Sequence, residues 1–251
     1  MNGAVPAIAA DRLVKNYGHV RALRHASFEA FAGQVTALVG DNGAGKSTLI
    51  KCLAGVIQPD DGRILVNGEQ VAMTDPLHAT RLGIETVHQD LALAPDLDAA
   101  ANVFLGRELR RLWILHDQPA MRRKTAMSFR ELGVGMVQDL RAPVAAFSGG
   151  QRQSVAIARA AMWARSVIIM DEPTAALGVI QTTRVLDLIR RIRDRGLAVV
   201  FISHNLPQVL EVADRIEVLR LGARVARFNK GEATIDMLIA AISGAYANEA
   251  A

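Results

Sequence analysis

The sequence predicts an α/β fold built on a parallel sheet, and three features of the chain carry that prediction. Short apolar runs rich in valine and isoleucine alternate with longer amphipathic stretches, as in layered α/β proteins. The first such run, residues 34–40, leads into a glycine-rich turn and then a helix from Lys46. Two later runs, residues 166–172 and 197–204, each end in polar residues. We expect these strand ends to meet at one edge of the sheet, where such folds bind ligands.

Two further stretches agree with this layered scheme. Residues 12–31 have the pattern of an antiparallel hairpin pair that turns at Gly18, which predicts a small β edge. Residues 178–194 carry an apolar stripe at helical spacing with arginines on the other face, as an amphipathic helix does.

The middle of the chain differs from its ends. Residues 90–165 are dominated by helical patterns, and Pro119 is well placed to start one of these helices. We therefore expect a single domain over residues 1–251. In it, residues 1–89 and 166–251 form the α/β core with its β edge, and residues 90–165 form a helical subdomain.

Composition narrows the class of protein. Of 251 residues, 51% are hydrophobic and 22% are charged, which is ordinary for a globular domain. No apolar run approaches the roughly 20 residues that cross a bilayer, and the N-terminus lacks the pattern of a secretion signal. The single cysteine, Cys52, excludes an internal disulfide. These features predict a soluble intracellular protein.

The formal charge of +4 comes from one stretch of the chain. Residues 107–130 hold seven basic residues against only Glu108 and Asp117. This stretch is either a solvated helix face or a surface that meets anionic lipid headgroups or an acidic partner. Aromatic side chains are not interleaved with the basic ones in the way that a base-stacking platform would need, so nucleic acid is the least favoured partner.

The sequence GDNGAGKST at residues 40–48 matches the phosphate-loop pattern G-x-x-x-x-G-K-[ST]. Its glycines let backbone N–H groups close around phosphate oxygens, and the following helix offers its positive N-terminal end. Lys46 is expected to reach the β- and γ-phosphates, and the Ser47 hydroxyl to ligate Mg²⁺. The predicted nucleotide-binding residues of this loop are Gly40, Asn42, Gly43, Ala44, Gly45, Lys46, Ser47 and Thr48.

Polar residues at the ends of the other two strands are the candidates for hydrolysis. Asp171 is placed to hold Mg²⁺, directly or through a water, and Glu172 follows it where a general base could orient water on the γ-phosphate. His204 ends the next strand and is predicted to lie beside the same phosphate site.

A second glycine pair lies far from the phosphate loop, in the sequence SGGQRQ at residues 148–153. Ser148 precedes a helix expected from about Gln151 to Trp163, so it is a candidate N-cap with free N–H donors near Gly149 and Gly150. This arrangement predicts a second anion site. The alternative is a simple capped helix, which would account for the serine and one glycine but not for the pair.

Taken in order, these motifs resemble those of ABC-type ATPases over nearly the whole chain. Residues 148–151, just ahead of the sequence DEPTAAL, resemble the signature motif of that family. The resemblance implies that Tyr17 stacks on adenine, that Gln89 senses Mg²⁺ and communicates with a membrane partner, and that His204 touches the γ-phosphate. It also implies a P-loop NTPase fold with a RecA-like core, a parallel sheet, a small antiparallel β edge and an inserted α-helical subdomain.

The resemblance implies a dimer as well. In ABC-type ATPases the signature closes over the γ-phosphate that the opposite subunit holds, so two ATP molecules are sandwiched head to tail. The residues expected to bind ATP in this way are Ser148, Gly149, Gly150 and Gln151.

The expected cofactors are ATP and Mg²⁺. The implied metal ligands are Ser47, Gln89 and Asp171. The implied catalytic residues are Glu172, His204 and Gln89.

Two local stretches resemble the ATPases of bacterial sugar importers of the ribose, xylose and fructose type: residues 102–109 and 171–196. The chain looks like the single-module kind. Its expected partners are a second copy of itself, a transmembrane permease that Gln89 and residues 107–130 contact, and indirectly a periplasmic solute-binding protein. It is then expected at the cytoplasmic face of the bacterial inner membrane, as a peripheral subunit.

Two positions depart from the family pattern. Phe147 replaces the usual leucine before the signature serine, which is a conservative apolar change. Gly178 replaces the aspartate of the common sequence SALD, so any junction contact that relies on that charge is in doubt.

Two other functions remain open from the sequence alone. A soluble ATPase of the same superfamily could act in DNA repair or translation, although such proteins normally need two modules, coiled coils or nucleic-acid domains. A nucleotide-dependent dimerisation switch with little hydrolysis is the other alternative, against which Glu172 and His204 argue.

Overall fold

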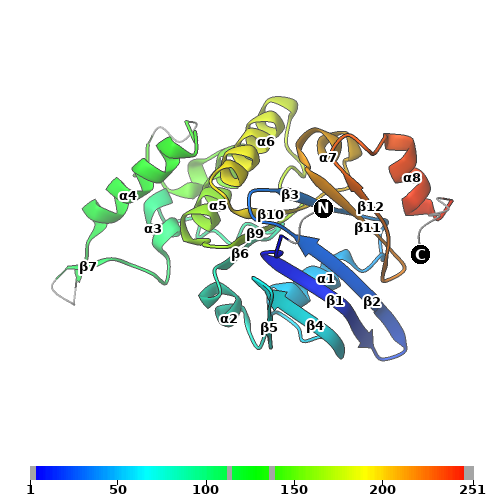
Figure 1. Cartoon of the computed structure of the whole chain (residues 1–251). Helices are drawn as coiled ribbons and strands as arrows, with labels where there is room; N and C mark the ends of the chain where they lie inside the picture. Colours follow the sequence, from blue (N-terminus) through cyan, green and yellow to red (C-terminus); the bar gives the residue numbers. More distant parts are fainter. Residues whose placement is uncertain (1–3, 112–114, 136–138, 246–251) are drawn as a thin grey trace.

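The centre of the molecule is a six-stranded sheet in the order β12-β11-β3-β10-β9-β6 (Figure 1). The computed structural model describes residues 4–111, 115–135 and 139–245. All neighbouring strands of this sheet are parallel except β12, which pairs antiparallel with β11 at one edge. The strands are β3 (Val35–Val39), β6 (Ile84–Val87), β9 (Val167–Asp171), β10 (Ala198–Ile202), β11 (Arg215–Arg220) and β12 (Ala223–Asn229).

The three strands predicted from the apolar runs are β3, β9 and β10, and they lie side by side. Their side chains alternate between the two faces of the sheet, as the two-residue period of a strand requires. On β10, Val199 and Phe201 belong to one hydrophobic core, while Val200 and Ile202 belong to the other. The sheet is therefore covered on both faces, and the carboxyl ends of these strands share one edge.

Different helices cover the two faces. The first face packs against α1 (Lys46–Leu53) and α2 (Pro76–Arg81), through residues such as Leu49 and Ala79. The second face packs against α5 (Gly149–Trp163), α6 (Val179–Asp194), α7 (Leu206–Val212) and α8 (Ile235–Ser243). The helix that follows the phosphate loop and the helix that follows the signature thus lie on opposite sides of the sheet.

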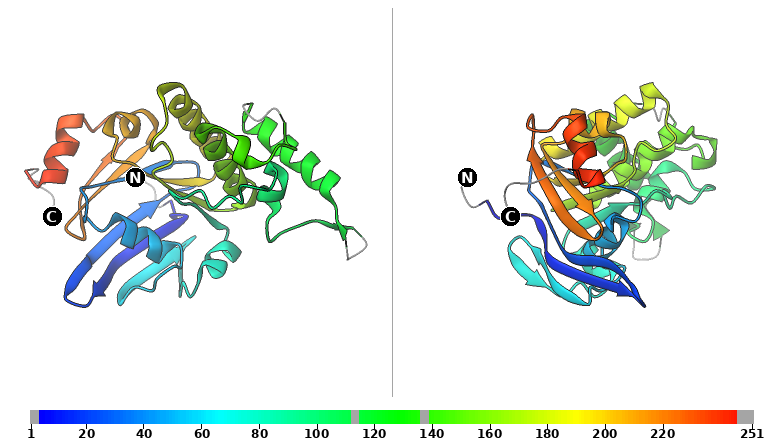
Figure 2. Two further views of the ribbon diagram at one scale, coloured as in Figure 1. Left: turned by 180° about the vertical axis from the view of Figure 1, so that it is seen from behind. Right: turned by 90° about the vertical axis from the view of Figure 1, so that its right-hand side faces the viewer.

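A second sheet, in the order β2-β1-β4-β5, forms the β edge. The hairpin of β1 (Ile8–Tyr17) and β2 (Val20–Ala30) turns at Gly18 as predicted. The edge is larger than predicted, because β4 (Asp61–Val66) and β5 (Glu69–Val71) extend it through a second antiparallel hairpin. Figures 1 and 2 show this sheet beside α1, below the central sheet in the view of Figure 1.

Between β6 and β9 the chain projects from one end of the core (Figure 2). It forms α3 (Ala99–Phe104), α4 (Gln118–Glu131), the short 3₁₀ helix η1 (Val144–Ala146) and α5. Pro119 lies in the first turn of α4, as predicted. Helical patterns did not predict the small hairpin of β7 (Arg110–Arg111) and β8 (Leu115–His116) within this segment.

Helix α5 begins two residues earlier than predicted. Gly149 and Gly150 form its first turn, because Ser148 caps the helix directly ahead of them. In the part of the chain that the structure describes, no helix has both the length and the apolar character needed to cross a bilayer.

Candidate active site

The phosphate loop has a shape that requires glycine at two points. Gly40 follows β3 with φ +155°, and a β-carbon there would lie 2.2 Å from the Leu219 carbonyl oxygen on β11. Gly45 caps α1 with φ +101°, and a β-carbon there would lie 2.7 Å from the Ala22 carbonyl oxygen. Any larger residue at either position would push the loop away from the sheet, so these glycines fix the cradle of the predicted site.

Lys46 lies at the centre of this loop. Its Nζ donates to the Gly40 carbonyl oxygen at 2.7 Å and to the Asp41 carbonyl oxygen at 2.9 Å. Burial lowers the pKa of the Lys46 ammonium, while the nearby carboxylates of Glu172, Asp41 and Asp171 act in the opposite direction. The predicted phosphate-binding cation and both predicted acidic residues therefore belong to one electrostatic group.

The rest of the loop divides into buried and exposed positions. Ala44 is buried in the core, and its N–H donates to the Asp41 carbonyl oxygen at 3.1 Å. Its role in the described structure is thus to brace the loop. Asn42, Gly43 and Ser47 are exposed, and Thr48 is half-buried in the first turn of α1.

Asp171 is the last residue of β9, and its backbone pairs with Ile202 of β10. Burial raises the pKa of its carboxyl, and the neighbouring negative charge of Glu172 raises it further. His88 and Lys46 act in the opposite direction, as a bound cation also would. A half-buried carboxylate of this kind suits a site where positive charge binds.

Glu172 takes a backbone conformation that is rare for a residue with a side chain, with φ +49°. Its N–H donates to the Ile202 carbonyl oxygen at 3.0 Å, and its carbonyl oxygen accepts from the Ala175 N–H at 3.1 Å. Strained residues of this type persist only where the surrounding structure holds them, and they cluster at functional sites. At Glu172 the chain thus turns out of the direction of β9.

His204 lies next to Glu172, as its position after β10 predicted. The distance from His204 Nδ1 to Glu172 Oε1 is 3.2 Å, and 73% of the His204 side chain is exposed. Two residues not predicted from the sequence stabilise this region: the Thr174 hydroxyl donates to Gln208 Oε1 of α7 at 2.6 Å. No motif marks this pair, because it depends on the loop after β9 meeting the helix after β10.

Gln89 and Tyr17 lie at the margins of the group. Gln89 is exposed in the loop that follows β6. Tyr17 ends β1 with 47% of its surface exposed, and the preceding residues are fastened by Asp60, which accepts from Lys15 Nζ and from the Asn16 N–H, both at 2.7 Å. Among the described residues, neither Gln89 nor Tyr17 hydrogen-bonds to the phosphate loop, so their roles stay predictions.

The signature forms a capping box. The Gln151 N–H donates to Ser148 Oγ at 3.3 Å, and the Ser148 N–H donates to Gln151 Oε1 at 2.8 Å. Gly149 is exposed, lacks a positive φ, and would accept a β-carbon with no atom within 4 Å. Capping therefore explains Ser148 and Gln151, but nothing within the described structure requires glycine at position 149.

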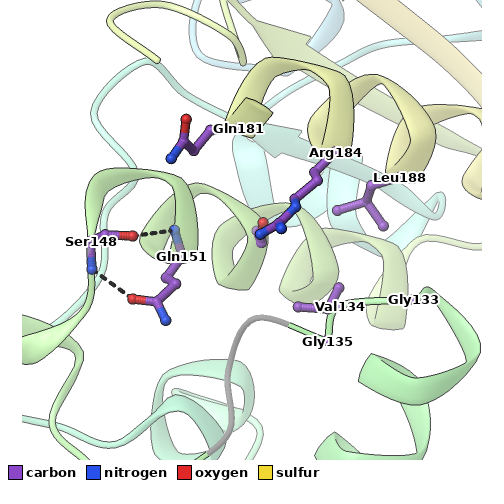
Figure 3. Close-up of a pocket in the computed structure, with 9 residues that line it drawn as sticks. Gly133, Val134, Gly135, Ser148, Gln151, Gln181, Arg184 and Leu188 are labelled. Carbon is purple, nitrogen blue, oxygen red and sulfur yellow. Dashed lines mark hydrogen bonds between the residues drawn. The ribbon is translucent and has the colours of Figure 1, made fainter. Parts of the chain in front are cut away.

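A cavity of about 660 Å³ opens beside the signature (Figure 3). Ser148 and Gln151 line one wall from α5, and Gln181 and Arg184 line the other from α6. The exposed Arg184 guanidinium forms no ion pair with any residue of the described ranges. The start of α5 is thus open to approach from outside.

A family model for the ABC transporter matches residues 23–175. The match covers more than half of the chain and includes the phosphate loop, the signature and the pair Asp171 and Glu172.

The chain belongs to the ABC transporter family.

It is an ATPase of this family, and the resemblance inferred from the motifs is confirmed. Several relatives are named as sugar-import ATP-binding proteins. The fructose import ATP-binding protein FrcA of Rhizobium meliloti is 47% identical over 96% of this chain and 95% of its own. The xylose/arabinose import ATP-binding protein XylG of Sulfolobus acidocaldarius is 44% identical over 88% of each chain. The ribose import ATP-binding protein RbsA 2 of Streptomyces avermitilis is 42% identical over 89% of this chain but only 44% of its own.

Solved structures confirm the fold. An ATP-binding cassette of an ABC transporter in its ADP conformation superposes with a TM-score of 0.80 at 25% identity, over 93% of this chain and 95% of that one. A dimeric bacterial ABC transporter cassette superposes with a TM-score of 0.75 at 23% identity, over 88% of this chain and 98% of that one.

Proposed function

We propose that two copies of this ABC ATPase pair head to tail, hydrolyse two molecules of MgATP, and drive uptake of a monosaccharide through a separate permease. The observation that carries the proposal is the separation of the two phosphate-binding motifs. The phosphate loop leads into α1 on one face of the sheet, whereas the signature begins α5 on the other. The site in which Lys46 holds a nucleotide is therefore completed by the signature of a second copy.

The character of Gly149 supports this arrangement. Its small size has no purpose within the described structure, since a β-carbon there would meet open space. The first N–H groups of a helix lack intrahelical partners and attract anions. A glycine lets a phosphate of another molecule approach them closely, which an added methyl group would hinder.

Hydrolysis at this site needs a metal ion and a base. The Ser47 hydroxyl, the Asp171 carboxylate and the Gln89 amide are oxygen ligands of the kind Mg²⁺ takes together with substrate phosphates. The half-buried Asp171 is suited to such a cation, because positive charge nearby offsets the cost of its burial. Mg²⁺ would supply charge stabilisation at the phosphates.

Glu172 is the proposed general base. Its strained backbone and the neighbouring His204 orient its carboxylate, and His204 is exposed enough to reach a γ-phosphate. Tyr17 is the proposed adenine platform, since its exposed ring lies on a strand end that Asp60 fastens.

The transport step follows from the named relatives, which import fructose, xylose or arabinose, and ribose. A groove of about 250 Å³ between α3 and α4 is lined by apolar residues such as Leu105 and Met121 and by charged ones, including Arg122, which pairs with Asp98. We assign this groove and the basic stretch 107–130 to the permease, with Gln89 as the link to the nucleotide. A periplasmic solute-binding protein delivers the sugar, and the ATPase lies at the cytoplasmic face of the bacterial inner membrane.

A base variant tests the proposal. Glu172→Gln is expected to bind MgATP, form a dimer that is stable to size-exclusion chromatography, and turn over about 100-fold or more slowly. The double variant Lys46→Ala/Glu172→Gln is the control, and it should stay monomeric because it cannot hold the phosphates. A monomeric Glu172→Gln protein at saturating MgATP, or one with full turnover, contradicts the proposal.

A further inference from the structure

The loop that carries Gln89 is held to the signature helix by one arginine. Arg159 lies three turns into α5, and its Nη1 donates to the Ala92 carbonyl oxygen at 2.8 Å. Its Nη2 donates to the Leu91 carbonyl oxygen at 3.0 Å. Both carbonyls lie within three residues of Gln89, so the guanidinium grips the chain just beyond the predicted metal-sensing side chain.

The segment to which Arg159 donates, residues 91 and 92, has a strained backbone. Ala92 has φ +48°, a left-handed conformation that non-glycine residues adopt only when their surroundings hold them. The two bonds from Arg159 meet the chain at this residue and the one before it, and they supply that restraint. Removing them would let the segment relax to a more ordinary conformation.

Helix α3 holds the far end of the same segment. Asn102 is fully buried, and its Oδ1 accepts from the Ala94 N–H at 2.7 Å. Its Nδ2 donates to the carbonyl oxygens of Ala94 at 3.0 Å and of Leu97 at 3.2 Å. The chain from residue 91 to residue 98 is thus fixed to α3 and α5 at both ends.

The preceding residues are not fixed in this way. Strand β6 ends at Val87, where it pairs with Met170 of β9 in the central sheet. Residues 88–90 are exposed, and within the described ranges no residue hydrogen-bonds to them. Gln89 therefore lies in a short link between the central sheet and a segment that is hydrogen-bonded to α5.

We propose that Arg159 is a positioning residue that sets the place of Gln89 according to the position of the signature helix. This inference rests on the proposed function, in which a second copy engages Ser148–Gly150 and Gln89 serves the nucleotide. Helix α5 is a rigid rod, and Arg159 lies about 16 Å along it from the signature serine. A shift of α5 on dimer closure pulls the carbonyls of Leu91 and Ala92, and Gln89 follows.

The test uses Arg159→Met, which keeps the apolar stem of the side chain and removes both donors. We expect its kcat for ATP to fall about 10- to 100-fold, because Gln89 is misplaced, while the ATP Kd of the isolated copy stays unchanged. Arg159→Lys should recover part of the lost kcat, because its ammonium can reach one carbonyl. Arg190→Met is the matched control, since it also removes a guanidinium, but Arg190 pairs with Asp187 and Glu211 rather than with residues 91 and 92.

Amide hydrogen exchange separates this inference from the proposed function. In Glu172→Gln, ATP-driven pairing should slow the exchange of residues 88–92, and in Glu172→Gln/Arg159→Met pairing should persist while that protection is lost. Equal protection in both paired proteins, or an unchanged kcat in Arg159→Met, overturns the role of Arg159 and leaves the dimer intact. Failure of Glu172→Gln itself to pair refutes the proposed function.

A folding defect does not leave the question open. If Arg159→Met fails to fold, Arg159→Lys undergoes the same measurements, with partial protection of residues 88–92 as the expected result. Full protection and full kcat in Arg159→Lys then overturn the inference, because an ammonium lacks the planar fork with which the guanidinium bonds to two carbonyl oxygens at once.

Discussion

The chemistry of this ATPase depends on a few charged side chains, on whose pKa values burial and neighbouring charges act in opposite directions. Burial disfavours the charge of Lys46 and that of Asp171, and each is partly compensated by the other. The site therefore has a cost in stability when no nucleotide or metal is present, as functional sites often do. Bound MgATP would satisfy both charges at once.

Asp171 gives this cost a measurable pH dependence. Because the pKa of the Asp171 carboxyl is raised in the folded state, protonation of this group favours folding. The contribution of this protonation to the free energy of unfolding is fully present below the unfolded-state pKa. The contribution is lost as the pH rises through the raised folded-state pKa. We expect Asp171→Asn to raise the free energy of unfolding of the nucleotide-free protein near neutral pH, with a difference from wild type that narrows as the pH falls. Urea unfolding monitored by circular dichroism across this pH range measures the effect.

Asp60→Asn provides a control of opposite sign. Hydrogen bonds from Lys15 and Asn16 lower the pKa of Asp60, so its contribution is present above the unfolded-state pKa and is lost as the pH falls. This variant should be less stable than wild type near neutral pH. If Asp171→Asn is also less stable there, the burial cost assigned to Asp171 is wrong.

At the scale of the element, most helices here begin with a side-chain cap. The capping side chains belong to Asp75, Asp98, Asp117, Ser148, Asn205 and Thr234. Helices α1 and α6 instead begin at Gly45 and Gly178, neither of which can provide a side-chain bond. Gly45 has a positive φ that favours glycine, but Gly178 has φ −70° and an extended ψ that any residue adopts.

Gly178→Asp should therefore stabilise α6. A β-carbon at this position would lie 2.9 Å from Gln181 Oε1, the end of a flexible side chain that can move aside. A capping carboxylate at the positive end of the helix should raise the free energy of unfolding by about 0.5–1 kcal/mol. Thermal unfolding measures this, with Gly178→Ala as a control that adds the β-carbon without the cap and should be destabilising. Equal stability of the two variants would exclude capping as the cause.

At the scale of the whole molecule, the proposed pairing of two copies depends on the position of the signature relative to the central sheet. Because α1 and α5 pack on opposite faces, mutations in the two phosphate-binding motifs should separate binding from turnover. Gly149→Ala is the cleanest variant, since a methyl group there meets no atom of its own chain. It should leave folding stability and the ATP Kd of the isolated copy unchanged while lowering dimer turnover at least about tenfold. Loss of nucleotide binding by the isolated copy would contradict this reading of the motif.

Mixing two defective copies tests the same arrangement. In a head-to-tail pair of Gly149→Ala and Lys46→Ala copies, one site combines an intact Lys46 with an intact Gly149, and the other combines both defects. An equal mixture should regain turnover at up to about a quarter of the wild-type sites, since half of the pairs are mixed. A mixture no more active than its parts would show that the motifs do not complement each other across the dimer.

The sequence by itself determined the family, the central strands and most of the residues proposed for the site. The phosphate-loop glycines could be predicted because a loop that approaches β2 and β11 so closely admits no β-carbon. The pair Asp171 and Glu172 could be predicted because the carboxyl ends of neighbouring parallel strands lie at one edge of the sheet. The hairpin of β4 and β5 carries a readable signal too, the pair Asn67–Gly68, which favours a tight turn.

Only the tertiary structure decided the contacts that join distant segments. The bond between Thr174 and Gln208, the grip of Arg159 on residues 91 and 92, and the opposite placement of α1 and α5 have no local signature. Each depends on which face of the sheet a helix covers and on how adjacent loops meet. Local patterns specify where a strand or helix begins, but packing determines what its side chains touch.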